Sequence, residues 1–157
     1  MKHVIFLAVF ITAAAASLSA YAGETEIRAC DFKAKAGCVS GDASVTLADG
    51  KVSKIEIDVI WCGQPGEPGY TCTIDSSRGD DDSKWSEEGS ATLIANASPF
   101  SPGQPDRVRV TVGKYVSIDL DEAQSVGRCG AGAELPRAIV IPTTKKKACR
   151  VWWSKEP

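Results

Sequence analysis

Apolar residues alternate with polar ones along residues 51–61, and this alternation restricts the fold more than any other feature of the sequence. The apolar positions are Val52, Ile55, Ile57, Val59 and Trp61. Successive side chains of a strand point to opposite faces, so the pattern predicts an antiparallel strand with one buried face. Asp49 and Gly50 stand between this segment and the β-type run 44–48. An Asp-Gly pair there predicts a two-residue hairpin turn, because both turn positions need a positive φ.

Further short strands are expected along the rest of the chain. They cover residues 70–74, 90–95, 107–112, 115–120, 138–141 and 149–153, with a second hairpin turn at Gly113-Lys114. Residues 23–41 are interpreted as an irregular segment, residues 75–88 as a polar, acidic loop, and residues 121–125 as at most one helical turn. The sequence therefore predicts an all-β fold, an antiparallel β-sandwich or small barrel of about seven or eight short strands.

Residues 1–22 have the organisation of a secretory signal peptide. Lys2 and His3 give a positive start, residues 4–16 are apolar, and Ala20-Tyr21-Ala22 is the small-x-small pattern that a signal peptidase cleaves. The alternative is an uncleaved membrane anchor, but the apolar run is short for a bilayer and no stop-transfer pattern follows it. We expect a single β-rich domain of residues 23–157, periplasmic or secreted, that does not associate with a membrane after cleavage.

An even number of cysteines in an exported chain predicts disulfides. The six are Cys30, Cys38, Cys62, Cys72, Cys129 and Cys149. Six cysteines allow 15 pairings, among which the sequence does not choose. Proximity along the chain favours pairing the first with the second, the third with the fourth and the fifth with the sixth. A cysteine-bound metal is disfavoured, because the chain has no C-x-x-C spacing and no histidine after the leader.

The chain lacks the residues on which most hydrolytic catalysis depends. Its only histidine, His3, lies in the predicted leader, so the usual Ser-His-Asp and Cys-His mechanisms are excluded from the mature protein. The sequence has 18 Lys and Arg against 20 Asp and Glu, a net charge of −2, whereas nucleic-acid-binding domains carry a basic excess. We therefore expect no catalytic residue, no cofactor, no bound metal and no nucleic-acid partner.

Two loops beside cysteines are the candidate binding elements. Residues 127–136 are rich in glycine, and the residues that we select there are Arg128, Gly130, Gly132 and Glu134. Residues 63–69 lie between Cys62 and Cys72, with Glu67 near the expected tip. A loop held by a disulfide is preorganised and loses little entropy on binding. The alternative interpretation is that these glycines and prolines serve tight surface turns alone.

Tryptophan supplies a different kind of candidate site. Trp61, Trp85, Trp152 and Trp153 could form a sugar-stacking platform, and we select Trp153 as a binding residue near the end of the chain. Consecutive residues of a strand point to opposite faces, so one of Trp152 and Trp153 is expected to face inward and the other outward. The simpler interpretation is that tryptophans fill the core.

Carboxylates are the remaining candidates. Asp80, Asp81 and Asp82 could bind calcium, but their spacing does not fit an EF-hand, so a solvated acidic loop is favoured. Glu87 and Glu88 are adjacent, so on an extended segment they point to opposite faces and not into one glycosidase-like cleft.

These observations favour a protein that binds over one that catalyses. The function that we predict is an exported envelope protein with a protein partner, such as a hydrolase or toxin. It would be an inhibitor or immunity protein that blocks a secreted or cell-wall hydrolase with a rigid loop. A carbohydrate-binding or adhesive surface module is the alternative, and a small histidine-free enzyme is a third and weaker one.

Overall fold

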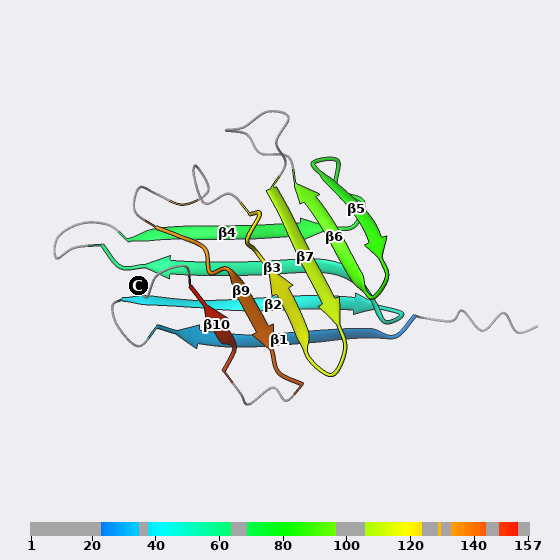
Figure 1. Ribbon diagram of the computed structural model, residues 1–157, viewed down its shortest axis with the longest axis horizontal. Coiled ribbons are helices and arrows are strands. Elements are labelled where there is room, and N and C mark those ends of the chain that lie inside the picture. Colours follow the sequence, from blue (N-terminus) through cyan, green and yellow to red (C-terminus); the bar gives the residue numbers. More distant parts are fainter. Residues whose placement is uncertain are drawn as a thin grey trace, which may run out of the picture.

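The computed structural model describes residues 23–34, 38–63, 69–96, 106–123, 129, 133–143 and 148–153, and they form an antiparallel β-sandwich (Figure 1). The four-stranded sheet has the order β1 (Thr25–Lys33), β2 (Val39–Ala48), β3 (Lys51–Trp61), β4 (Tyr70–Ser77). The six-stranded sheet has the order β10 (Arg150–Trp152), β9 (Ala138–Ile141), β8 (Val116–Asp119), β7 (Asp106–Val112), β6 (Ala91–Asn96), β5 (Ser83–Glu88). The predicted fold class is confirmed. The described ranges contain no apolar helix of membrane-spanning length.

The first hairpin has the predicted turn. β2 pairs with β3 through Ala48 and Lys51, and the two residues between them, Asp49 and Gly50, have φ of 51° and 75°. Two positive φ values give the turn a twist that matches the flanking strands. The second predicted hairpin is also present, with β7 paired to β8 through Val112 and Val116.

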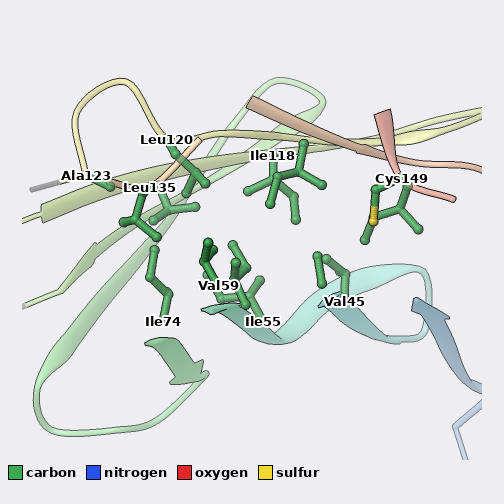
Figure 2. Close-up of a cluster of buried hydrophobic side chains, with 14 of the residues drawn as sticks. Val45, Ile55, Val59, Ile74, Ile118, Leu120, Ala123, Leu135 and Cys149 are labelled. Atoms are coloured by element: carbon green, nitrogen blue, oxygen red, sulfur yellow. The ribbon is translucent and has the colours of Figure 1, made fainter. Parts of the chain in front are cut away.

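The core lies between the two sheets and consists of the alternating residues of both. Ile55, Ile57 and Val59 of β3 are fully buried in one cluster with residues of the other sheet. Figure 2 shows Ile55 and Val59 on the side of the core opposite Ile118 of β8. Burial of one such side chain contributes about 1.5–3 kcal/mol. The period-two pattern of the sequence therefore identified the buried face correctly.

Two segments that were interpreted as irregular are strands, and ten strands are described where seven or eight were predicted. Residues 23–41 contain β1, and residues 75–88 contain the end of β4 and all of β5. Both missed strands lie at sheet edges, and their burial pattern shows why: β5 has no fully buried residue and β1 has only Cys30 and Phe32. A hydrophilic edge strand lacks the apolar alternation from which strands are predicted.

The three disulfides do not follow proximity along the chain. They join Cys30 to Cys149, Cys38 to Cys62, and Cys72 to Cys129. Three disulfides are thus confirmed and the pairing that proximity favours is wrong, because the antiparallel topology brings distant residues together. Such bonds are compatible with an extracellular or periplasmic protein.

The outer face of the four-stranded sheet carries a row of aspartates. Asp31 pairs with Asp42, and Asp42 pairs with Asp58, so three carboxylates lie directly opposite one another on β1, β2 and β3. Thr73 of β4 extends the row and donates a hydrogen bond to Asp58 at 2.6 Å. Loss of hydration raises the pKa of the central Asp42, and the neighbouring carboxylates Asp58, Asp31 and Glu56 raise it further.

We expect Asp42→Asn to stabilise the protein by about 0.5 kcal/mol at neutral pH, because like charges directly opposite on a sheet repel. The folded state holds the Asp42 proton more tightly than the unfolded chain does. Ionised Asp42 therefore lowers the free energy of unfolding, and this loss develops as the pH rises from the ordinary pKa of 3.8 through the raised pKa of the folded state. The gain from the substitution should vanish below that window. Chemical denaturation at neutral pH and at a pH below 3.8 measures the change in the free energy of unfolding. Asp81→Asn, in the exposed turn after β4, is the control.

Candidate functional site

Two of the three disulfides, Cys38–Cys62 and Cys72–Cys129, lie at one end of the four-stranded sheet, on the left in Figure 1. We call this the disulfide end, and it consists of the last residues of β1 and β3 and the first residues of β2 and β4. Cys30–Cys149 lies nearer the middle of the sheet, because Cys30 pairs with Ala43 of β2. Cys38–Cys62 joins the residue before β2 to the residue after β3. Cys30–Cys149 and Cys72–Cys129 join this sheet to the segments that precede β10 and follow β8. The end is thus cross-linked within one sheet and to the chain of the other.

The first candidate loop, residues 63–69, is anchored at the disulfide end. It connects β3 to β4, whose residues Trp61 and Tyr70 are paired across the ladder. A side-chain carbon on Gly69 would lie 2.6 Å from the Trp61 carbonyl oxygen, so the two arms of the loop meet closely at its base. The Cys62 amide also donates to the Cys38 carbonyl at 2.8 Å, beside the disulfide between the same residues.

The second candidate loop, residues 127–136, is anchored at the same end. Cys129 is bonded to Cys72 of β4, which is fully buried. The Trp61 indole N–H donates to the Glu134 carbonyl at 3.0 Å, and Ala133 and Leu135 on either side of that residue are buried in the core. One covalent bond and one hydrogen bond therefore connect this loop to the two strands that carry the first.

Three aromatic rings pack beside these anchors. The Trp61 and Trp153 rings are 5.8 Å apart, edge to face, and the Phe32 and Trp153 rings are 6.4 Å apart in a similar arrangement. Such pairs contribute about 0.5–1.5 kcal/mol each beyond the area that they bury. The cluster packs residues of β1 and β3 against the residue after β10, next to the anchors of both loops.

The structure separates the predicted site residues into two groups. Glu134 is exposed at the disulfide end, and Trp153 is half-buried in the aromatic cluster. Arg128, Gly130, Gly132 and Glu67 lie outside the described residues, so their role stays a prediction. The two consecutive tryptophans do differ in environment as expected: Trp152 is the exposed one, at 48%.

Two exposed apolar residues at this end were not selected from the sequence. Ile60 and Tyr70 lie on β3 and β4, next to the start and the finish of the first loop. Ile60 had a usable signal, because it interrupts the alternation formed by Val59 and Trp61. Tyr70 had none, because an aromatic residue at the start of a strand is more often part of the core.

A shallow hollow of about 310 Å³ lies on the outer face of the six-stranded sheet. Its lining consists of Glu88, Leu93, Arg107, Arg109, Asp119, Asp121 and Glu122. Arg109 pairs with Glu88 at 2.8 Å and Arg107 with Glu122 at 3.3 Å. The hollow is therefore polar, with planar charged groups already paired around one apolar residue.

The acidic candidates do not converge on a common point. Asp80 accepts a hydrogen bond at 2.6 Å from the Ser77 amide within the turn between β4 and β5. Glu87 binds Arg78 and Thr92, whereas Glu88 binds Arg109, so the two glutamates point to opposite faces as predicted. Within the described ranges no three Asp, Glu, His or Cys side chains are grouped so as to hold a metal ion.

Comparison with known proteins identifies no relative. No family model matches the chain, no curated protein matches its sequence and no solved structure matches its fold. The geometry of the disulfide end and of the sheet faces is what remains to indicate a function.

Proposed function

We propose that this chain is an exported binding protein that inhibits a secreted or cell-wall hydrolase, or gives immunity to one, through loops at the disulfide end. The observation that carries the proposal is that both candidate loops are anchored at the same end, on the adjacent strands β3 and β4. Loops 63–69 and 127–136 together would offer one composite surface to one protein partner.

The anchoring supports tight binding on physical grounds. Ordering a mobile loop costs roughly 0.5–1.5 kcal/mol for each side chain that is immobilised on binding. The disulfides Cys38–Cys62 and Cys72–Cys129 fix the bases of the two loops before any partner arrives. A loop that is already constrained avoids part of this cost, which is why stiff loops suit the blocking of an enzyme cleft.

The exposed side chains around the anchors have the composition of a protein interface. Ile60 and Tyr70 are exposed large apolar residues, and Glu134 is an exposed acidic one. Interface centres are enriched in aromatic residues with a polar rim around them. The remaining selected residues, Arg128, Gly130, Gly132 and Glu67, belong to the same two loops in the sequence.

The experiment is an inhibition assay with the oxidised protein against a panel of peptidoglycan hydrolases and glycosidases on purified cell walls. We expect stoichiometric inhibition of one enzyme class. Glu67→Ala should then weaken inhibition about tenfold or more, because residues at the centre of an interface dominate its affinity.

The matched control is Asp81→Ala, which removes one carboxylate from the exposed turn at the opposite end of β4. It should leave inhibition unchanged. Full hydrolase activity at excess protein throughout the panel would reject the proposal, as would equal effects of the two substitutions.

A carbohydrate-binding module is the second candidate, and one observation favours it. Trp152 is exposed and lies in a cross-strand row with Ala138, Asp119 and Arg109, the last two of which line the hollow of the six-stranded sheet. Aromatic rings with planar polar groups beside them suit a sugar, whose faces are apolar and whose edge is hydroxylated. Binding to an insoluble polysaccharide that Trp152→Ala abolishes, without any hydrolase inhibition, would favour this function over the first.

A further inference from the structure

The edge of β1 is only partly covered. β1 is the last strand of its sheet, and among the described strands it pairs only with β2. Near its end, the Cys149 amide donates to the Asp31 carbonyl at 2.9 Å, and Cys30 is bonded to Cys149. These contacts cover the edge at residues 30 and 31. Within the described ranges no backbone bond covers the outer edge of residues 25–29, although the Arg28 guanidinium donates to the Gly113 carbonyl at 3.0 Å. An open edge presents unpaired backbone donors and acceptors, which can pair with another strand.

The hydrogen bonds show which residues face the open side. The Asp49 amide donates to the Glu24 carbonyl and the Ala34 amide donates to the Val39 carbonyl, so the even-numbered residues exchange bonds with β2. The β1–β2 register has no irregularity. The odd-numbered residues therefore direct their N–H and C=O groups outward, as the bond to Asp31 confirms. The outward groups of Thr25, Ile27 and Ala29 have no partner among the described residues.

A hollow of about 270 Å³ runs along this open stretch. It is lined by residues 24–29 of the β1 edge and by Pro142 and Thr143 after β9. Ile27, at the middle of the stretch, is 55% exposed and is the most exposed large apolar side chain of the described residues. The edge thus combines free backbone groups, space beside them and an apolar residue at its centre.

The charges beside Ile27 are self-complementary. Glu26 and Arg28 flank it. Within one chain the Arg28 guanidinium donates two hydrogen bonds to the Glu26 carboxylate, at 2.7 and 3.3 Å, and one to the Gly113 carbonyl at 3.0 Å. In an antiparallel pair of identical strands centred on Ile27, Glu26 stands opposite the partner's Arg28, and Arg28 opposite the partner's Glu26. These are non-hydrogen-bonded pairs, in which side chains approach most closely.

We propose that two copies of this chain associate through their β1 edges, antiparallel and centred on Ile27. Three residues of each chain, Thr25, Ile27 and Ala29, supply the hydrogen bonds, and the two four-stranded sheets become one sheet of eight strands. The centre of the open stretch and the charge pattern select the same register independently. Only residues 25–29 pair, so the interface is small and the association concentration-dependent.

The test is sedimentation equilibrium of the protein, expressed from its full sequence under oxidising conditions. We expect the average mass to rise from one chain toward two with increasing concentration. Glu26→Arg and Arg28→Glu should each weaken self-association about tenfold or more, because each places like charges opposite one another twice. An equimolar mixture of the two variants should associate again, since every opposed pair is then of opposite charge.

Two further variants separate an edge effect from a folding defect. Ile27→Pro removes an outward N–H without removing any bond to β2, so it should abolish association while the near-ultraviolet circular dichroism stays native. Lys84→Glu, on β5 of the other sheet, should change nothing. A native protein that stays monomeric at every concentration overturns the proposal, and so does a mixture of the charge variants that fails to associate. Neither result bears on hydrolase inhibition.

Discussion

Replacing both Cys30 and Cys149 by alanine is expected to lower the free energy of unfolding by about 5 kcal/mol, the largest effect of any disulfide in the protein. The two residues are 119 apart in the sequence, against 57 for Cys72 and Cys129 and 24 for Cys38 and Cys62. A cross-link restricts the unfolded chain more as the loop that it closes lengthens. The same relation gives about 3.5 kcal/mol for the shortest of the three loops.

Denaturant titration of the three paired alanine variants measures this order. Total stability for a domain of this size is about 5–15 kcal/mol, so loss of the longest cross-link removes a large part of it. The variant without Cys38–Cys62 serves as the internal control, because its cross-link lies within one sheet. If that variant proves the least stable of the three, unfolded-chain entropy does not govern these bonds.

Gly41→Ala is expected to destabilise the protein by about 3 kcal/mol. Gly41 of β2 stands opposite Phe32 of β1, whose ring lies over it. An added carbon would lie 2.2 Å from the Asp58 carbonyl oxygen and 2.5 Å from the Phe32 ring. Backbone on one side and an aromatic ring on the other leave no room, and forced insertion into a packed core costs typically 1–3 kcal/mol or more.

Thermal and denaturant unfolding check this value, and Gly50→Ala is the matched control. Gly50 has a positive φ and no atom within 4 Å of an added carbon, so its substitution costs only backbone strain, about 1–2 kcal/mol. Adding Phe32→Ala to Gly41→Ala should not restore stability, because the contact with the Asp58 carbonyl remains. Equal costs at the two glycines would show that packing over Gly41 is unimportant.

The sequence predicted the interior of this fold better than its edges. The alternation along β3 and the Asp49-Gly50 turn are properties of the local sequence, so both could be predicted without knowing the topology. β1 and β5 were not predicted because an edge strand needs few buried residues. Hydrophilic residues such as Lys84 and Glu87 give no apolar alternation from which a strand could be predicted. The edge of β1, on which the proposed self-association depends, therefore could not be predicted from the sequence.

The candidate site was also predicted where it depends on local sequence and missed where it depends on topology. The glycine and cysteine content identified both loops as candidates. It could not show that they lie at the same end, because this depends on the pairing of β3 with β4 and on the disulfide between Cys72 and Cys129. The disulfide pairing failed for the same reason. Trp153 was selected as a binding residue from its place near the end of the chain, whereas packing with Phe32 and Trp61 makes Trp152 the more accessible of the two.

The one-sided placement of the disulfides also governs how the molecule comes apart. Fluctuations that separate the strands should start around the Asp49-Gly50 turn, where no covalent bond crosses between strands, and stop at Cys38–Cys62 and Cys30–Cys149. A partly opened molecule would keep the disulfide end assembled. The resistance of the disulfide end to heat or proteases would then exceed what the free energy of unfolding of the whole domain suggests.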